Sequence, residues 1–459
     1  MYKLNFHEPI QIHFIGIGGI SMSGLAEILL DENFTVTGSD AKESDLTRHL
    51  AQRGARIYLG QRAENITPET QAVVYTAAIH PDNPEYAAAK NAGIPMLTRA
   101  ELLGQIMANY RDSIAVSGTH GKTTTTSMIA DILLEASMDP TISVGGILDS
   151  IGGNIRVGNS EFFLTEACEY TNSFLNFYPK YSIILNIEAD HLDFFKDLDD
   201  IRHSFHRFAS NTAPDGTLIL NGAIPNLSEI TEGLNQKVIT FGLEADCDVY
   251  AEDISFNDKG CATFSAIVSG QKIGTFTLYV PGTHNIANAL AAIALSTELG
   301  LSVETIQKGL CVFHGTDRRF QFKGKLGDVT IIDDYAHHPT EIKATLTAAQ
   351  NYPHDRIICI FQPHTYTRTK SLFPDFVSAL AMADVIVLAD IYAARETDTL
   401  GVSSEQIRDE LVKLGKEAYY FPSFQEIEEF LLKFCMNNDL LITMGAGDIL
   451  KVGEHLLDK

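Results

Sequence analysis

The 459-residue sequence predicts an α/β protein of three domains with mainly parallel sheets. At roughly 150 residues per domain, the length is enough for about three domains. Apolar runs typical of strands alternate with helical patterns along the whole chain, which is the pattern of parallel α/β folds. A new strand-and-glycine pattern begins near residues 12, 114 and 331, which predicts domains at 1–108, 109–319 and 320–459.

The expected elements follow the chain in a simple order. Predicted strands lie at residues 12–15, 34–37, 114–116, 162–165, 182–187, 331–332, 357–361, 385–388 and 440–443. The clearest helical patterns lie at 26–30, 128–133 and 287–299. The segment 246–280 differs because it is rich in Thr, Ser and Gly with short alternating runs, which predicts antiparallel hairpins attached to the middle domain.

The composition excludes several classes of protein. Lys and Arg total 34 against 59 Asp and Glu, and the net charge of −25 repels phosphate backbones, so we expect no nucleic acid partner. Apolar residues make up 45% and charged residues 20%, which is ordinary for a globular protein. The six cysteines contain no C-x-x-C pair, so we expect reduced thiols rather than a zinc or redox site.

The first residues do not look like a targeting signal. His7, Glu8 and Pro9 stand where a secretory signal would need an unbroken apolar core. No long uncharged apolar run elsewhere could span a bilayer. The sequence therefore predicts a cytoplasmic protein without a membrane partner.

The first predicted strand runs into a glycine loop. Gly16, Gly18 and Gly19 precede a helical pattern, a layout in which the helix N-terminus can receive a pyrophosphate, as in Rossmann-like domains. The full G-x-G-x-x-G fingerprint fails at Ser21, although Asp40 stands where a ribose-binding acid is expected. The loop alone leaves two interpretations open, an anion site and a tight turn that binds nothing.

A second loop has stronger chemistry. The predicted strand at 114–116 leads into seven residues of a shortened phosphate loop: Gly118, Thr119, His120, Gly121, Lys122, Thr123 and Thr124. Backbone N–H groups and Lys122 can cradle nucleotide phosphates, while the Thr123 hydroxyl can hold Mg²⁺. A cation in the first turn of a helix opposes the macrodipole, so a bound anion explains Lys122 better than solvent exposure does.

The segment G-T-H-G-K-T at 118–123 resembles the ATP site of the Mur ligases, which join amino acids to the peptidoglycan precursor. Further motifs similar to those of this family follow in order at 165–169, 186–193, 282–288 and 317–320, and cover nearly the whole chain. The first glycine loop and the segments 333–341 and 361–369 are similar to the family member that adds L-alanine.

This resemblance implies a Rossmann-like UDP-sugar domain at 1–108, a P-loop-like ATPase domain at 109–319 and a Rossmann-like amino-acid domain at 320–459. The implied reaction is ATP-dependent joining of L-alanine to the carboxylate of UDP-N-acetylmuramate through an acyl phosphate. ATP and Mg²⁺ are the implied cosubstrate and cofactor.

The resemblance also implies the site residues. The catalytic set is Lys122, Glu166 and His191, and the Mg²⁺ set is Thr123, Glu166 and His191. ATP contacts are the residues of the phosphate loop together with Asn285, Arg319 and Asp334. UDP-sugar contacts are Gly16, Gly18, Gly19, Ser39 and Asp40, and amino-acid contacts are Tyr335, His337 and Arg368.

For some of these residues the chemistry suggests simpler roles. A carboxylate such as Glu166 suits Mg²⁺, whereas the metal role of His191 follows from the resemblance alone because Mg²⁺ prefers oxygen. Asn285 can be read as a helix N-cap and Arg318 as a surface salt-bridge partner. Arg368 can be read as half of a buried ion pair with an acid such as Asp334.

The sequence also departs from the family pattern. Ser204, Phe205 and His206 stand where several sister ligases have a modified lysine that helps to hold Mg²⁺, which favours the alanine-adding member. Thr365 stands where many alanine-adding enzymes have arginine, which leaves Arg368 as the basic residue of that motif.

Other functions remain as alternatives. A sister ligase that attaches a recycled tripeptide would share the features of residues 1–320. A nicotinamide-dependent oxidoreductase would use only the first glycine loop. A P-loop switch or motor would have no use for that first loop. We do not expect a zinc site at His337, His338 and His364, because consecutive histidines point apart on extended chain and no thiolate joins them.

Overall fold

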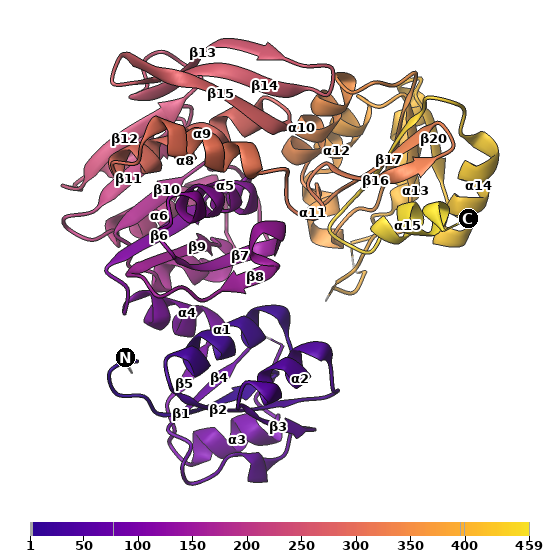
Figure 1. Ribbon diagram of the computed structural model, residues 1–459. Helices are drawn as coiled ribbons and strands as arrows, with labels where there is room; N and C mark the ends of the chain where they lie inside the picture. Colours follow the sequence, from indigo (N-terminus) through magenta and orange to yellow (C-terminus); the bar gives the residue numbers. More distant parts are fainter. Residues whose placement is uncertain (1–2, 77, 395, 399, 459) are drawn as a thin grey trace.

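The computed structural model describes residues 3–76, 78–394, 396–398 and 400–458. It contains three sheets, each with helices packed against it, and the three units follow one another along the chain (Figure 1). The predicted three-domain α/β fold with mainly parallel sheets is confirmed. None of the helices in the described part of the chain combines the length and apolarity needed to cross a bilayer.

The first unit is a five-stranded sheet in the order β3-β2-β1-β4-β5, parallel throughout. Its strands are β1 Gln11–Ile15, β2 Thr35–Asp40, β3 Arg56–Leu59, β4 Ala72–Tyr75 and β5 Met96–Thr98. Its helices are α1 Ile20–Asp31, α2 Asp45–Gln52, η1 Ala63–Asn65, α3 Pro84–Asn91 and α4 Arg99–Met107.

The second unit is a ten-stranded sheet in the order β15-β14-β13-β12-β11-β10-β6-β9-β7-β8. Its strands are β6 Asp112–Ser117, β7 Thr141–Leu148, β8 Gly153–Arg156, β9 Phe162–Ala167, β10 Tyr181–Ile184, β11 Thr217–Asn221, β12 Lys237–Gly242, β13 Val249–Phe256, β14 Cys261–Val268 and β15 Gln271–Pro281. Its helices are α5 Lys122–Glu135, η2 Asp149–Ile151, η3 Tyr170–Asn176, α6 Leu198–Ser210, α7 Leu227–Thr231, α8 His284–Glu298 and α9 Val303–Val312.

The third unit is a six-stranded sheet in the order β16-β17-β21-β18-β19-β20, antiparallel only between β16 and β17. Its strands are β16 Gln321–Leu326, β17 Val329–Asp334, β18 Ile357–Phe361, β19 Val385–Leu388, β20 Glu417–Tyr420 and β21 Leu440–Met444. Its helices are α10 Pro339–Gln350, α11 Tyr366–Ser371, α12 Phe373–Leu380, α13 Ser404–Lys413, α14 Phe424–Phe434 and α15 Leu450–Leu457.

All the predicted strands form, and one ends earlier than expected. The apolar run at 182–187 continues past β10, which stops at Ile184. The segment after β10 leaves the sheet and forms hydrogen bonds with the phosphate loop. Leu185 and Ile187 in this segment are nevertheless buried. The predicted antiparallel hairpins of 246–280 are β13, β14 and β15, and β13 continues the main sheet through a short parallel pairing with β12.

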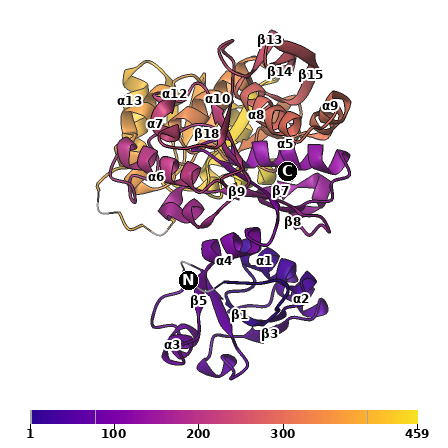
Figure 2. The ribbon, with the colours of Figure 1, turned by 90° about the vertical axis from the view of Figure 1, so that its left-hand side faces the viewer.

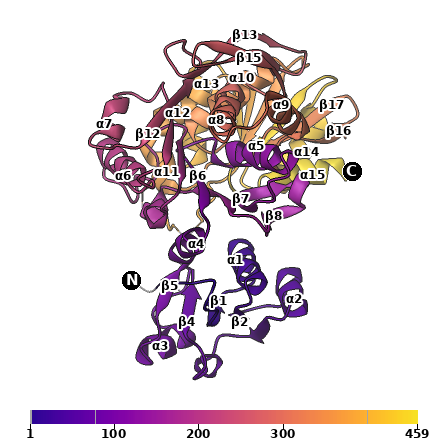
Figure 3. The same cartoon turned by 60° about the vertical axis from the view of Figure 1, so that its left-hand side comes forward.

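The first unit contacts the second through two helices, α1 and α4 (Figures 2 and 3). At Gly24 on α1 an added Cβ would lie 2.1 Å from Cγ1 of Ile155 on β8, and at Gly104 on α4 it would lie 2.1 Å from the carbonyl oxygen of Asn176. Glycine therefore leaves room for the Ile155 side chain at the first contact and for a close approach of backbone at the second. The predicted domain boundaries fall in connectors, between α4 and β6 and between α9 and β16, and they stay predictions.

Candidate active site

The phosphate loop joins β6 to the first turn of α5. Gly118 and Gly121 have φ values of 143° and 83°, which favour glycine. Gly121 is the N-cap of α5 and offers no side chain to the free N–H groups of the first turn. The backbone N–H groups of Thr119 and His120 donate to the backbone and side-chain oxygens of Asn186 at 3.2 and 2.8 Å. The loop is therefore fixed to the segment after β10, with a helix N-terminus open to an anion.

Lys122 folds back over this loop instead of extending into solvent. Its Nζ donates to the carbonyl oxygens of Gly118 and Thr119 at 2.5 and 3.1 Å and to Oε2 of Glu169 at 2.9 Å. Burial disfavours the charged amine, but the negative charge of Glu169 outweighs it and raises the pKa of Lys122. Lys122 is therefore a half-buried cation paired with a buried carboxylate beside the loop. Sequence reasoning did not select Glu169, although it lies in one of the family-like motifs.

Glu166, near the end of β9, meets the residue after Lys122. The Thr123 hydroxyl donates to Oε2 of Glu166 at 3.1 Å, and the Gly145 N–H donates to Oε1 at 2.5 Å. Burial raises the pKa of Glu166. A half-buried hydroxyl and carboxylate side by side are the hard oxygen donors that Mg²⁺ prefers, so these two residues fit the predicted metal.

His191 follows β10 in a left-handed turn, with φ of 54°. Its Nε2 lies 3.8 Å from Oε1 of Glu169 and 3.7 Å from Oδ2 of Asp190, and its ring lies against Tyr170 with centroids 4.5 Å apart. Burial lowers the pKa of His191, so the neutral imidazole is the favoured form. Glu169 thus lies between Lys122 and His191, while Glu166 meets Thr123, the residue after Lys122, so the three predicted catalytic residues lie in one region.

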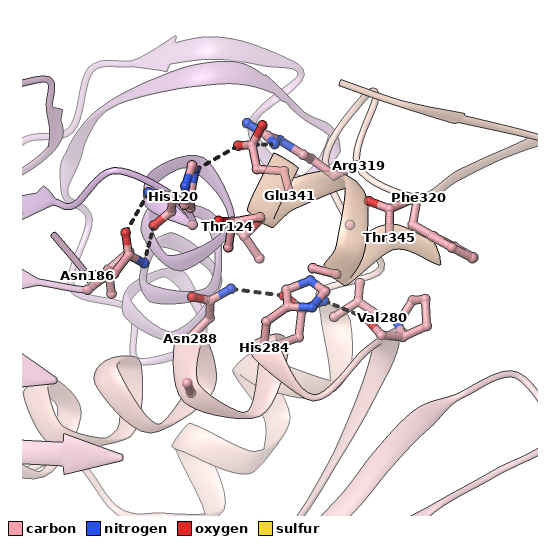
Figure 4. A pocket seen from close by; sticks show the side chains of 18 of the residues that line it. His120, Thr124, Asn186, Val280, His284, Asn288, Arg319, Phe320, Glu341 and Thr345 are labelled. Carbon is pink, nitrogen blue, oxygen red and sulfur yellow. Dashed lines mark hydrogen bonds and ion pairs between the residues drawn. The ribbon is translucent and has the colours of Figure 1, made fainter. Parts of the chain in front are cut away.

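A pocket opens between the middle and C-terminal units, beside the phosphate loop (Figure 4). Six of the predicted ATP contacts line it: His120, Gly121, Thr124, Asn285, Arg319 and Asp334. Glu341 at the start of α10 lies between two of them, with Oε1 3.2 Å from Nδ1 of His120 and 3.7 Å from Nη1 of Arg319. Sequence reasoning did not select Glu341, although it belongs to the motif at 333–341.

Asn285 does not cap a helix, so that simpler interpretation is wrong. Helix α8 begins one residue earlier at His284, after Thr283 as N-cap. The Asn285 side chain donates to the Pro281 carbonyl at 2.8 Å and accepts from Asn288 at 3.0 Å. These bonds hold a largely buried amide at the wall of the pocket, where a polar base edge could meet it.

The interpretation of Arg318 as a surface salt-bridge partner is right about the ion pair but wrong about the surface, because the side chain is half-buried and its acid is buried. Its Nε donates to the buried carboxylate of Asp333 at 3.0 Å, and its other nitrogens donate to the carbonyls of Gly445 and Gly447 at 2.6 and 3.1 Å. Asp334, the next residue on β17, accepts backbone N–H groups instead. Burial raises the pKa of Asp334 to about 6.

A second hollow holds the predicted amino-acid contacts. Tyr335, His337 and Arg368 line it together with Asp190 and His191. The alternative interpretation of Arg368 as half of an ion pair holds in kind, but the acid is Asp190 and not Asp334. Nε and Nη2 of Arg368 both donate to Oδ1 of Asp190, at 3.1 and 3.0 Å.

The neighbouring histidines of this hollow do not converge on one point. His337 faces the Tyr335 carbonyl, with Nδ1 at 3.0 Å, and its ring lies 5.9 Å from that of His364. His338 turns toward the ring of His120, 4.8 Å away. Burial lowers the pKa of His337 to about 4.

The first glycine loop lies in the N-terminal unit, on a different sheet from the phosphate loop (Figure 1). The N–H groups of Gly16 and Ile17 donate to the Ser39 carbonyl, and the Gly18 N–H donates to Oδ2 of Asp40 at 2.8 Å. The Ser39 hydroxyl points inward and donates to the buried Glu85 at 2.6 Å. Ser39 therefore organises the loop through its backbone, and a sugar contact by its side chain has no support in this geometry.

Taken together, the fold and the site define a three-domain α/β protein with a nucleotide-type phosphate loop at the junction of its middle and C-terminal units. Three family models match it in order. They are described as Mur ligase family, catalytic domain (residues 11–111), Mur ligase middle domain (116–296) and Mur ligase, glutamate ligase domain (318–447). The chain belongs to the Mur ligase family.

Individual relatives agree with this assignment. A UDP-N-acetylmuramate--L-alanine ligase of Agathobacter rectalis is 66% identical over the full length of both chains, and one of Clostridium novyi is 53% identical over 98% of this chain and 97% of its own. The crystal structure of the UDP-N-acetylmuramate-alanine ligase from Thermotoga maritima has a TM-score of 0.80 at 31% identity, with 98% of each chain covered. A murein peptide ligase from Psychrobacter arcticus has a TM-score of 0.70 at 26% identity, with 98% of each chain covered.

Proposed function

We propose that the chain joins L-alanine to the carboxylate of UDP-N-acetylmuramate and converts ATP to ADP and phosphate, in peptidoglycan precursor synthesis in the cytoplasm. One structural relationship carries the proposal. Asp190 and His191 are adjacent in the chain, and they connect two sites: His191 faces Glu169 beside Lys122, while Asp190 binds Arg368 in the amino-acid hollow. ATP bound beside Lys122 and an amino acid bound in the hollow would therefore place the phosphoryl donor and the attacking amine on either side of Asp190 and His191.

The chemistry explains why both sites must adjoin. A carboxylate is a poor electrophile, so the γ-phosphoryl group is first transferred to the muramoyl carboxylate, giving an acyl phosphate and ADP. The alanine nitrogen then attacks the acyl carbon, the amide bond forms, and phosphate leaves with the C–O electron pair. Enclosure between domains keeps water from the acyl phosphate, which it would hydrolyse.

The residues have distinct roles in this scheme. Lys122 and the N–H groups of the phosphate loop hold the phosphates, and Thr123 and Glu166 hold Mg²⁺. When bound, Mg²⁺ neutralises phosphate charge, so that two anionic substrates can approach each other. His191 is an uncharged group beside the reacting centre, because its pKa is lowered. Its Nε2 faces the carboxylate of Glu169.

The proposed substrate sites divide among the three domains. We assign the UDP-sugar to domain 1–108 through the loop at Gly16, Gly18 and Gly19 and through Asp40, ATP to domain 109–319, and L-alanine to domain 320–459 beside Tyr335, His337 and Arg368. The first turn of α1 supports an anion site, because its N-cap Gly19 offers no side chain to the free N–H groups of that turn. Preference for a small amino acid is intrinsically modest, at roughly 1–3 kcal/mol per added group, so glycine and L-serine should react slowly.

The tripeptide-adding function remains the nearest alternative, since the murein peptide ligase shares the fold. An oxidoreductase gives no role to the Lys122–Glu169 pair of the phosphate loop, and a P-loop switch gives none to the amino-acid hollow. Competition between L-alanine and tripeptide at equal concentration separates the two ligases.

The decisive experiment measures ADP release with each substrate omitted in turn. The proposal expects ADP only when ATP and UDP-N-acetylmuramate are present, with sustained turnover only after L-alanine is added. ATP hydrolysis independent of the UDP-sugar would indicate a switch or motor, and preferential ligation of tripeptide would assign the recycling function.

A further inference from the structure

Three side chains from separate segments converge at the edge of the ATP pocket. His120 comes from the phosphate loop, Glu188 from the segment after β10, and His338 from the residue before α10. One possible ligand atom from each lies within 4.8 Å of the other two, in a group that is half-buried to buried. The first two residues belong to the middle unit and His338 to the C-terminal unit, so the group exists only where the two units meet.

His120 is oriented as metal-binding histidines are. Its Nδ1 lies 3.2 Å from Oε1 of Glu341, while its buried Nε2 has no hydrogen-bond partner among the described residues and lies 3.5 Å from Oε2 of Glu188. A histidine that binds a metal usually donates its second ring N–H to a carboxylate, which fixes the ring and raises its basicity. Glu341 occupies that position, and the free nitrogen faces the other two members of the group.

The other two members have comparable support. Oε2 of Glu188 accepts the Thr340 hydroxyl at 2.6 Å, and its backbone N–H donates to the Thr119 hydroxyl at 2.9 Å, so the carboxylate is held in place. His338 makes only long contacts, 3.3 Å from Nε2 to the Ala189 carbonyl and 3.3 Å from Nδ1 to the Thr340 N–H. A metal bond to Nε2 would replace the first of these weak contacts at little cost.

We propose that His120, Glu188 and His338 form a binding site for a transition-metal dication such as Zn²⁺, which joins the middle and C-terminal units. Two imidazole nitrogens and one carboxylate oxygen suit Zn²⁺, with ligand bonds of roughly 2.0–2.2 Å. Side-chain rotations that move each of the three ligand atoms by under about 1 Å would bring them to that distance from a common metal ion. Mg²⁺ is not favoured here because it prefers oxygen ligands, so this site differs from the one at Thr123 and Glu166.

The acid–base state of His120 is compatible with metal binding. Burial disfavours the imidazolium, but the carboxylates of Glu188 and Glu341, whose oxygens lie 3.5 and 3.2 Å from its two ring nitrogens, outweigh it and raise the pKa of His120 to about 9. Two carboxylates therefore already stabilise positive charge at this ring. A dication would take the place of the proton on Nε2, with the proton released to solvent.

Bound metal would also affect the reaction, and this part rests on the proposed function. His120 belongs to the phosphate loop, so a metal that ties it to His338 holds the loop and α10 together beside the nucleotide site. Zn²⁺ should then inhibit ADP release in saturating Mg²⁺, and a high ATP concentration should relieve the inhibition.

Binding is measured first without substrates, by titration calorimetry of the full chain with Zn²⁺ in excess Mg²⁺. The expected result is one tight site per chain, with proton release seen as a dependence of the heat on the buffer. Glu188→Gln and His338→Asn should each weaken this binding at least tenfold, while Glu166→Gln, the matched change at the Mg²⁺ site, should leave it unchanged. Melting curves verify that the variants are folded.

Anomalous diffraction at the zinc edge locates the ion directly. Density between His120, Glu188 and His338 supports the proposal. Density only elsewhere, no tight site, or binding that survives both Glu188→Gln and His338→Asn would overturn it. Failure of the proposed function would appear separately, as ADP release that does not depend on the UDP-sugar in metal-free enzyme.

Discussion

Arg368 donates through both Nε and Nη2 to one carboxylate oxygen of Asp190, at 3.1 and 3.0 Å, across 178 residues of sequence. Its remaining nitrogen donates to Nδ1 and the carbonyl oxygen of His364. Burial alone would raise the pKa of Asp190, but the charge of Arg368 holds it well below the ordinary value. The guanidinium proposed to bind the alanine carboxylate therefore also connects helix α11 to the middle unit.

This pairing predicts that the two residues act as one unit. Arg368→Ala and Asp190→Asn should each raise the KM for alanine far more than that for ATP, and each should lower kcat/KM about 30-fold or more, because each leaves a buried partner unsatisfied. The double variant should be no worse than Arg368→Ala alone. Steady-state kinetics of the three variants test this, and additive losses would show that the residues work independently.

Lys122→Ala should lower kcat by about 10²-fold or more, because the cation proposed to lie beside the transferred phosphoryl group is lost. The same change leaves Glu169 without its cation, so a structural cause must be separated from a chemical one. The double variant Lys122→Ala/Glu169→Gln removes the orphaned charge. We expect it to stay inactive in ADP release, whereas recovery of activity would mean that Lys122 serves only to neutralise Glu169.

Glu166→Gln should raise the Mg²⁺ concentration for half-maximal activity about tenfold or more, since the amide keeps the size of the side chain but removes its charge. Glu161→Gln, an exposed acid just before the same strand, is the matched control and should not change it. Mg²⁺ titrations of ADP production provide the test. An unchanged requirement in Glu166→Gln would exclude this residue as a ligand.

Much of the fold could be predicted because its signals are local. The runs at 357–361 and 385–388 are strands β18 and β19 with the same bounds, since apolar periodicity and glycine positions act within a few residues. The run at 182–187 was overextended because burial alone does not distinguish a strand from a buried loop. Leu185 lies just after strand β10. Its N–H donates to the Ser117 carbonyl, and its side chain is buried although the residue is outside the strand.

The site was predictable in position but not in its pairings. Glu166 lies near the end of strand β9 and His191 follows strand β10, at the carboxyl ends where parallel sheets gather ligands, and this follows from sequence order. The partners of Lys122, His120 and Arg368 come from distant segments, which no local pattern specifies. Arg318 was misplaced for a related reason, because its left-handed backbone, with φ of 62°, turns the side chain inward toward Asp333.

The glycine loop of the first domain gives a prediction for UDP-sugar binding. Asp40→Ala removes the acceptor of the Gly18 N–H and should raise the KM for UDP-N-acetylmuramate about tenfold, with the KM for ATP unchanged. Glu43→Ala, a nearby exposed acid, is the control. Gly18→Ala should act in the same direction, because a Cβ there would lie 2.8 Å from Oδ2 of Asp40. Equal effects on both substrates would argue against a UDP-sugar role for the loop.

The last prediction concerns stability away from the site. Asp131 is buried in the middle of α5 and accepts the Ser150 hydroxyl at 2.5 Å. Burial raises the pKa of Asp131 to about 6, with opposing contributions from Ser150 and His314. Since the folded pKa lies above the unfolded one, the group favours folding most below about pH 4, and that contribution is lost as the pH rises through about 6.

Above pH 6 the buried charge therefore costs up to about 3 kcal/mol. Asp131→Asn keeps the acceptor for Ser150 and removes the charge, so its melting temperature should exceed that of the parent at pH 8 and match it near pH 4. The exposed neighbour Asp149, changed to Asn, should show no such crossover. Differential scanning calorimetry between pH 4 and 8 measures both variants, and a constant difference across that range would mean that Asp131 does not titrate there.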